Sequence, residues 1–332
     1  MRVAENLNLA LHQAFESDPA VHLLGEDVAD PYGGAFKITK GLSSRFPDRV
    51  LSTPLSEGGI AGVAAGLALA GHPAIVEIMF GDFAALAFDQ IVNFAGKSVS
   101  MYGRRLALPL VVRCPSGAGR GYGPTHSQSL QKHFVGVPGL SLYEISPFHD
   151  NRVLLPRILG RAEPALLFED KVLYTRQMFG DGIVDGVFSF DLMECGTARV
   201  FLDDPDTFDC VLIVPGGLAH RAVAAARTLM LEDEISCLVL VPARLYPFDV
   251  EPLLPALSRA AAICVAEDGT AGGTWGGEVA HQIHRRLWGR LRRPVTLVHA
   301  ADTVIPTAVH LEEQVMVREG TITAALRETL SD

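Results

Sequence analysis

Short apolar runs alternate with longer helical segments along most of the chain, and this alternation constrains the fold more than any other feature. The runs HPAIVEIMF at 72–80, LPLVVRC at 108–114 and PALLFED at 164–170 are typical of buried strands. Segments between such runs, at 58–71 and near 148–160, have the composition and length of helices. Because strands that alternate with helices form mostly parallel sheets covered on both faces, the predicted fold class is α/β.

The alternation breaks once, where GDG, VDG and DDPD predict turns rather than strands or helices. It then resumes with four more apolar runs and four more helical segments. A chain of 332 residues is too long for one ordinary core and suits two. We therefore predict two doubly wound domains, at 1–175 and 206–332, joined by a linker at 176–205.

Charge and cysteine content exclude several classes of function. The formal net charge is −10, which argues against nonspecific binding of nucleic acid. The basic run from Arg285 to Arg293 is interpreted as a solvated helix end, where cations complement the helix dipole. No apolar run is long enough to span a membrane, and the first residues predict an amphipathic helix rather than a signal peptide. Five widely spaced cysteines predict neither disulfides nor a zinc site and favour the reducing cytoplasm.

The segment TPLSEGGIAG at 53–62 places an acid, Glu57, between a strand end and a helix rich in small apolar residues. An acid at a helix start is often only a favourable contact with the helix dipole. The helix behind Glu57, however, has the composition of a buried one. Burial raises the pKa of a carboxyl group, which suits a residue that shares a proton with a ligand. We therefore take Glu57 as a candidate catalytic residue.

Two further candidates follow the strand predicted at 72–80. Met79 and Phe83 lie at the turn between this strand and a helix predicted at 82–103. Aromatic residues in such segments usually belong to the core. Ligands nevertheless bind at the carboxyl ends of parallel strands, where Met and Phe can hold a flat ring by stacking and sulfur–aromatic contact.

The loop GAGRGYGPTHSQSLQ at 117–131 has too many glycines to be a simple connector. Glycines allow a backbone to approach a ligand closely. The loop carries His126, and a histidine on such a loop is a better functional candidate than one on a helix face. Its G-x-G-x-G-x-G spacing differs from the dinucleotide-binding fingerprint. The GDG at 180–182 lacks the downstream Asn of a magnesium–diphosphate motif, so we interpret it as a turn.

Several of these motifs together resemble one family. TPLSEGGIAG, EIMFGDFAALAFDQIVN, THSQSL, VPGL and the late AEDG…GGTWGGE are similar to the E1 β subunits of 2-oxo-acid dehydrogenase complexes, in the same order. The resemblance implies a transketolase-type pyrimidine-binding domain followed by a transketolase C-terminal domain. It also implies thiamine diphosphate shared with an α subunit that holds the diphosphate and Mg²⁺, in an α₂β₂ heterotetramer with a β–β contact.

The resemblance also implies roles for individual residues. Glu57 matches the acid that hydrogen-bonds the pyrimidine ring nitrogen and controls its tautomer, and Met79 and Phe83 match positions that contact the pyrimidine. Glu26 resembles a member of an acidic path that joins the two cofactor sites. His126 matches a histidine that faces the substrate or the incoming lipoyl group. A structural K⁺ held by backbone carbonyls is a further expectation, with Arg161 one position before the candidate site.

Three functions remain open at this point. The first is oxidative decarboxylation of a 2-oxo acid with transfer of the acyl group to a lipoyl acyltransferase, E2. The second is a thiamine-dependent decarboxylase or carboligase of a biosynthetic pathway, for which the divergent segments 241–249 and 303–320 leave room. The third is a non-catalytic assembly subunit. Pyruvate-type relatives often have Phe at the position of Ile60. This one difference does not identify the 2-oxo acid that is the substrate.

Overall fold

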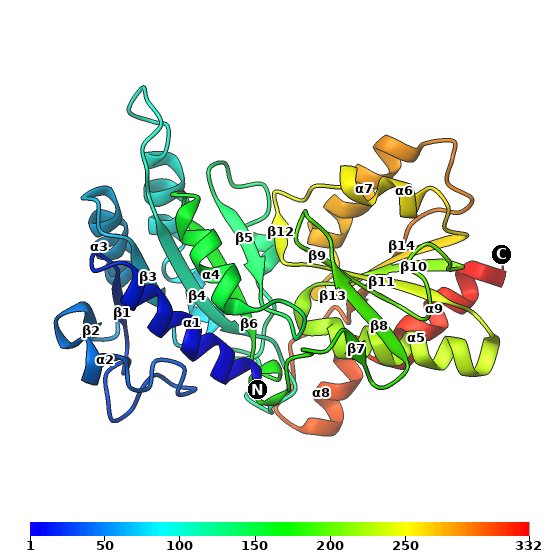
Figure 1. The fold of residues 1–332 in the computed structure, drawn as a ribbon, viewed down its shortest axis with the longest axis horizontal. Coiled ribbons are helices and arrows are strands. Elements are labelled where there is room, and N and C mark those ends of the chain that lie inside the picture. Colours follow the sequence, from blue (N-terminus) through cyan, green and yellow to red (C-terminus); the bar gives the residue numbers. More distant parts are fainter. Residues whose placement is uncertain (332) are drawn as a thin grey trace. The chain divides into compact units, whose positions relative to one another are not determined.

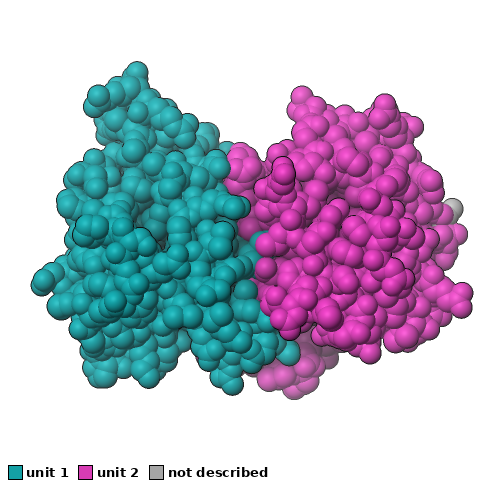
Figure 2. Space-filling model, viewed as in Figure 1, with its two compact units in different colours: residues 1–117, 136–145, 149–178 teal, residues 118–135, 146–148, 179–332 magenta. Residues whose placement is uncertain are grey.

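The computed structural model describes residues 1–331 and divides into two compact units. Figure 1 shows the order of their helices and strands, and Figure 2 colours the units separately. The first unit consists of residues 1–117, 136–145 and 149–178. The second consists of residues 118–135, 146–148 and 179–332. The predicted α/β class is confirmed, because each unit is built on its own sheet.

The sheet of the first unit contains parallel strands in the order β5-β6-β4-β3-β1-β2. Most of its strand residues are buried, as expected for a sheet with helices packed on it. Because the strands run parallel, their carboxyl ends lie at one edge. The strands are β1 (His22–Gly25), β2 (Val50–Ser52), β3 (Ala74–Glu77), β4 (Leu110–Ser116), β5 (Ser141–Glu144) and β6 (Ala165–Asp170).

The helices of the first unit are α1 (Val3–Ser17), α2 (Leu42–Arg45), α3 (Glu57–Leu69) and α4 (Asn151–Gly160). Asn6 links α1 to α4, since its Nδ2 donates to Asp150 Oδ1 and its Oδ1 accepts from the backbone N of Asn151, both at 2.8 Å. The helix predicted at 82–103 forms in shorter pieces, a 3₁₀ helix at Gly81–Ala85 and a π-helical segment at Gln90–Gly96. Such π-helical turns are rare and are common near functional sites.

The sheet of the second unit has the order β14-β13-β10-β11-β9-β8-β7. Its parallel strands are β10 (Cys210–Ile213), β11 (Cys237–Pro242), β13 (Ala262–Thr270) and β14 (Thr296–Ala300). Three strands from the turn-rich segment extend it antiparallel: β7 (Ile183–Val184), β8 (Phe188–Leu192) and β9 (Thr197–Phe201). A short strand, β12 (Arg244–Tyr246), follows β11 in the chain.

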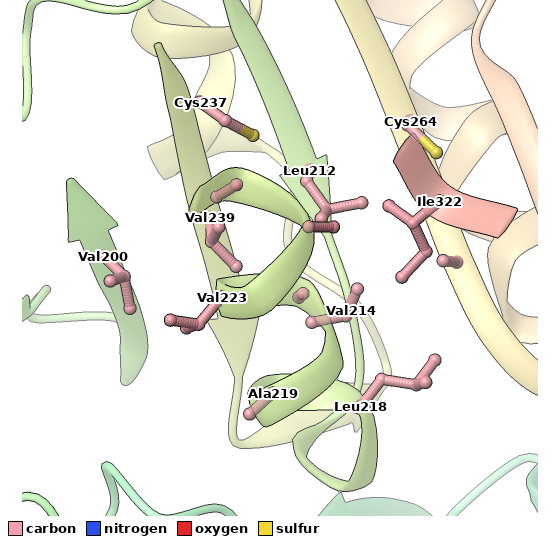
Figure 3. Packing of buried hydrophobic residues seen from close by; sticks show 14 of the residues in the cluster. Val200, Leu212, Val214, Leu218, Ala219, Val223, Cys237, Val239, Cys264 and Ile322 are labelled. Atoms are coloured by element: carbon pink, nitrogen blue, oxygen red, sulfur yellow. The ribbon is translucent and has the colours of Figure 1, made fainter. Parts of the chain in front are cut away.

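The core of the second unit lies between this sheet and two helices. Val223 from α5 and Ile322 from α9 pack with buried strand residues such as Leu212 and Val239 (Figure 3). Removing these apolar surfaces from water stabilises the unit. The helices of the second unit are α5 (Ala219–Asp233), α6 (Leu254–Leu257), α7 (Trp275–Leu287), α8 (Val309–Val315) and α9 (Glu319–Ser331).

All five cysteines are free thiols, and four of them are buried. Burial raises the pKa of Cys264 to about 12 and also raises the pKa of Cys114. The pKa of Cys237 is raised first by its contact with the Cys210 side chain and then by burial. Cys195 is the exposed one. Within residues 1–331, no helix is both long and apolar enough to cross a membrane. The same residues contain no cluster of three or more His, Cys, Asp or Glu side chains that could hold a metal ion.

Candidate active site

The carboxyl edge of the first sheet gathers four of the five predicted site residues. Glu26 directly follows β1, and Glu57 begins the helix after β2. Met79 and Phe83 follow β3. Strands β2, β1 and β3 are neighbours in the sheet, so these side chains come from adjacent strand ends. This is the place where open α/β sheets bind ligands.

Glu57 is the first residue of α3 and is only 8% exposed. The glycines that follow it explain this burial. A Cβ atom on Gly58 would lie 3.3 Å from the carbonyl oxygen of Leu86, and one on Gly62 would lie 3.0 Å from Gln90 Oε1. The small residues therefore allow the segment after β3 to lie close against α3. This contact holds the Glu57 carboxyl group in a largely dry place.

Glu26 is a second buried carboxyl group, 4% exposed, and it lies near Glu57. Burial raises the pKa of Glu26, and the charge of Glu57 raises it further. The backbone amide of Ser56 lies near enough to lower this pKa in part, but within residues 1–331 neither oxygen of Glu26 accepts a hydrogen bond of normal geometry. A carboxyl group beside a second one holds its proton more readily than it would alone, and this applies here to Glu26. Buried acceptors without partners also suit a ligand that brings N–H donors.

An aromatic group lies at the same edge of the sheet. The Phe80 ring makes edge-on contacts with Phe36 and Phe83, at centroid distances of 5.6 and 5.9 Å. Phe36 also contacts Tyr174 at 5.3 Å. Phe83 and Met79 are only partly buried, so part of their apolar surface remains available to a flat ring.

Tyr174 connects these aromatic rings to a charged network that the sequence analysis did not predict. Arg113 of β4 donates from Nε and Nη2 to both oxygens of Glu169, at 2.7 and 2.8 Å, and from Nη1 to Glu77 at 2.5 Å. The hydroxyl of Tyr174 donates to Glu169 at 2.6 Å. Arg113 and Glu169 are fully buried, and Glu77 nearly so. The signal in the sequence was one charged residue in each of the apolar strands β3 and β4, and two at the end of β6.

The network has a clear electrostatic balance. Burial alone would lower the pKa of Arg113, but Glu169 and Glu77 raise it above its usual range, so the guanidinium stays charged. Burial raises the pKa of Glu77, and Arg113 opposes that shift. Gly34, with φ +78°, is required beside this network because a Cβ atom there would overlap the Glu77 carboxylate. The network thus fixes the ends of β3, β4 and β6 and the loop that carries Phe36.

The fifth predicted site residue, His126, belongs to the second unit. Its Nδ1 lies 2.8 Å from Thr125 Oγ1, and its side chain is partly exposed. Both ends of its loop are anchored within the unit. The backbone amides of Gly119 and Gly121 donate to Glu312 of α8 at 2.9 and 3.2 Å, and Lys132 Nζ donates to Thr270 Oγ1 at 2.8 Å.

The glycines of this loop have a local reason. A Cβ atom on Gly123, which has φ +77°, would lie 2.6 Å from Thr307 Oγ1. The loop therefore runs close against the segment before α8. A pocket of about 610 Å³ lies beside it, lined by Thr125, Gln128, Lys132 and His133, by the last residues of β13 and β14, and by residues that follow β14. Burial, followed by the charge of Lys132, lowers the pKa of His133.

Comparison with known proteins accounts for this architecture. The family model for the transketolase pyrimidine-binding domain matches residues 1–177, and the model for the transketolase C-terminal domain matches residues 202–322. The β subunit of acetoin:2,6-dichlorophenolindophenol oxidoreductase from Cupriavidus necator is 31% identical over 98% of this chain and 96% of its own. The chain is a member of the transketolase-like E1 β family. The family predicted from the sequence motifs is thereby confirmed.

Other matches place the E1 β chain in the same group. The pyruvate dehydrogenase E1 component subunit β of Rickettsia bellii is 30% identical over 98% of this chain and 97% of its own. A solved structure described as a split-gene transketolase, inactive beta4 tetramer, covers 98% of this chain and 97% of its own, with a TM-score of 0.73 and 20% identity. That likeness shows the fold. The roles of Glu26, Glu57, Met79, Phe83 and His126 in this E1 β chain stay predictions.

Proposed function

We propose that this chain is the β subunit of a thiamine-diphosphate-dependent 2-oxo-acid dehydrogenase E1. Together with an α subunit, it decarboxylates a 2-oxo acid and transfers the acyl group to lipoyl-E2. The observation that carries this proposal is the buried pair Glu26 and Glu57 beside Met79 and Phe83, at the carboxyl edge of a pyrimidine-binding domain. The names of the relatives from Cupriavidus and Rickettsia support the reaction class.

The residues at this edge fit the aminopyrimidine of thiamine diphosphate. The ring offers flat faces to Met79 and Phe83, and its amino group and ring nitrogen match carboxyl groups that lie in a dry site. Glu57 would hold a proton at its carboxyl group and hydrogen-bond the ring nitrogen, while Glu26 keeps a second acid nearby. Bound thiamine diphosphate supplies the electron sink that decarboxylation of a 2-oxo acid requires. The protein supplies orientation, tautomer control and exclusion of water.

The proposed α subunit would cover an apolar face of the first unit. The outward side of α3 carries Gly59, Val63 and Gly66, with no charged side chain, and the nearby Leu55 and Leu86 are highly exposed. Exposed apolar surface of this kind is typical of an interface between subunits. We propose an α₂β₂ heterotetramer in which the α subunit holds the diphosphate and Mg²⁺. A β–β contact and docking of a lipoyl acyltransferase belong to the same proposal, as does a cytoplasmic location.

A structural K⁺ remains part of the proposal. An Arg161 side chain that pointed inward would repel this cation, but the side chain points outward. Its Nε donates to Glu163 Oε1 at 2.8 Å and its side chain is well exposed. The charge of Arg161 is thus balanced at the surface by Glu163. The guanidinium does not compete with K⁺ for the backbone carbonyls of this segment.

The decisive experiment is co-expression with an α-type partner followed by calorimetry with thiamine diphosphate and Mg²⁺. We expect tight binding by the α/β complex, and at least about tenfold weaker binding by the isolated chain because the diphosphate and Mg²⁺ would lack their ligands. A panel of 2-oxo acids with an artificial electron acceptor then identifies the substrate. Equally tight binding by the isolated chain would contradict the shared site. A stable complex without binding or turnover would contradict the function.

His126 gives a second prediction. We expect His126→Ala to reduce acyl transfer to lipoyl at least about tenfold more than decarboxylation, because the side chain would exchange a proton only during transfer. The two steps are separated by assaying with lipoyl-E2 and with an artificial electron acceptor. His281→Ala, which alters an exposed histidine on α7, serves as the control. Equal losses in both assays would remove the transfer-specific role.

A further inference from the structure

The two tryptophans of the chain have opposite environments. Trp275 is 1% exposed, and its Nε1 donates to the carbonyl oxygen of Leu245 at 2.9 Å. Trp288, at the end of α7, is 83% exposed. It is the most exposed of the large apolar side chains among residues 1–331. An indole in water is unusual, and exposed tryptophans are among the residues that contribute most to protein interfaces.

Four arginines surround Trp288 in the chain. Arg285 and Arg286 lie in the last turn of α7, and Arg290 and Arg292 follow the tryptophan. All four are exposed, and residues 279–301 contain no Asp or Glu. Arg286 forms an ion pair with Glu251 at 2.5 Å. For the other three, no carboxylate within residues 1–331 is a partner.

The helix dipole explains only part of this arrangement. Cations in the last turn of a helix are favourable, which accounts for Arg285 and Arg286. Helix α7 ends at Leu287, however, and Gly289 turns the chain with φ +76°. Arg290 and Arg292 lie beyond that turn, and the dipole gives no reason to expose Trp288. A docking surface explains all of these features together.

We propose that Arg285, Arg286, Trp288, Arg290 and Arg292 form a surface that binds an acidic segment of another protein. Carboxylates of that segment would receive hydrogen bonds from the guanidinium groups, which match them in shape and charge. An apolar side chain between the carboxylates would cover the indole. Arg and Trp are the side chains that most often dominate such interfaces.

The charge pattern favours an acidic segment of a different chain over two other partners. Two copies of this chain meeting symmetrically through the surface would place arginines against arginines, which repel one another. A long nucleic acid would also meet the rest of a chain whose net charge is −10. A short acidic segment senses mainly the local arginines, because salt screens charges beyond about 10 Å.

The test uses the fluorescence of the full chain, since Trp288 is itself the reporter and Trp275 is a buried, constant background. The probe is the synthetic peptide DEELLEED. We expect its binding to shift the emission of Trp288 to the blue, and added salt to weaken it. The triple variant Arg285→Ser, Arg290→Ser, Arg292→Ser should raise the Kd at least tenfold. A double variant at two exposed arginines of the first unit, Arg104→Ser and Arg157→Ser, should not.

Four outcomes would overturn the proposal. The first is an unchanged Kd for the triple variant. The second is that the peptide binds without shifting the emission to the blue, or that the shift persists in the Trp288→Phe variant. The third is equal binding of the uncharged peptide NQQLLQQN. The fourth is tighter binding of an oligonucleotide of the same charge at the same salt concentration, which would assign the surface to nucleic acid. None of these readouts depends on activity, so the result stands apart from that of the proposed enzyme function.

Discussion

The Glu57→Gln variant is expected to assemble with its α partner and to lose most of its turnover, by roughly 10²- to 10⁴-fold. Glutamine has nearly the same shape as glutamate, so the tight packing of α3 against the segment 86–90 should be kept. The amide cannot hold and release the proton that the proposed mechanism assigns to Glu57. The acid partner of Glu26 is also lost, which removes the second cause of the raised pKa of Glu26.

The measurement is decarboxylation with an artificial electron acceptor, together with calorimetry of cofactor binding and a thermal melt. We expect an unchanged melting temperature and a large loss of kcat. Glu313→Gln is a matched control, because Glu313 is an exposed acid of α8 in the other unit. If Glu57→Gln decarboxylates at the normal rate, Glu57 does not control the tautomer and the proposed mechanism fails.

The second large effect concerns stability. Replacing Arg113 with Met is expected to lower the free energy of unfolding by about 3–5 kcal/mol. The variant leaves Glu77 and Glu169 buried without their cation, and a buried uncompensated charge costs far more than a lost surface pair. The hydrogen bond from Tyr174 remains with Glu169 but cannot replace three charge-assisted bonds.

Urea unfolding of the full chain, followed by circular dichroism, measures this change. The control is Arg105→Met, which breaks an exposed pair with Glu163 and should cost about 1 kcal/mol or less. A combined Arg113→Met, Glu77→Gln, Glu169→Gln variant should regain part of the loss, because it removes the unpaired charges as well. A loss for Arg113→Met no larger than that for Arg105→Met would show that the network does not hold the strand ends.

Sequence periodicity predicted the two-sheet fold because strands buried on both faces are continuous apolar runs. It did not predict β7, β8 and β9, since these short strands lie among turn residues and are stabilised by pairing with β11 through β9. The prediction of one continuous helix at 82–103 was wrong. Its 3₁₀ and π-helical pieces follow from packing against α3 and β4, which local pattern does not report.

The candidate site shows the same division. The positions of Glu26, Glu57 and Met79 at strand ends were readable, because strand ends are marked by a change of composition. The pairing of Arg113 with Glu77 and Glu169 was not, because it depends on β4 lying between β3 and β6 in the sheet. The order of the strands along the chain does not show which strands are neighbours in the sheet. The burial of Arg113 is likewise a property of the folded sheet and not of its strand.

The arrangement of the thiols has a practical consequence for solution work. Three of the buried cysteines lie in neighbouring strands of one sheet, β10, β11 and β13. The pKa of Cys264 in β13 is held far above neutrality by burial, and that of Cys237 in β11 by its contact with Cys210 and by burial. Thiol reagents react with the thiolate, so these sulfur atoms are shielded both sterically and chemically. Cys195, in the turn between β8 and β9, is exposed. A maleimide dye would therefore mark one defined site on the second unit without any engineered cysteine.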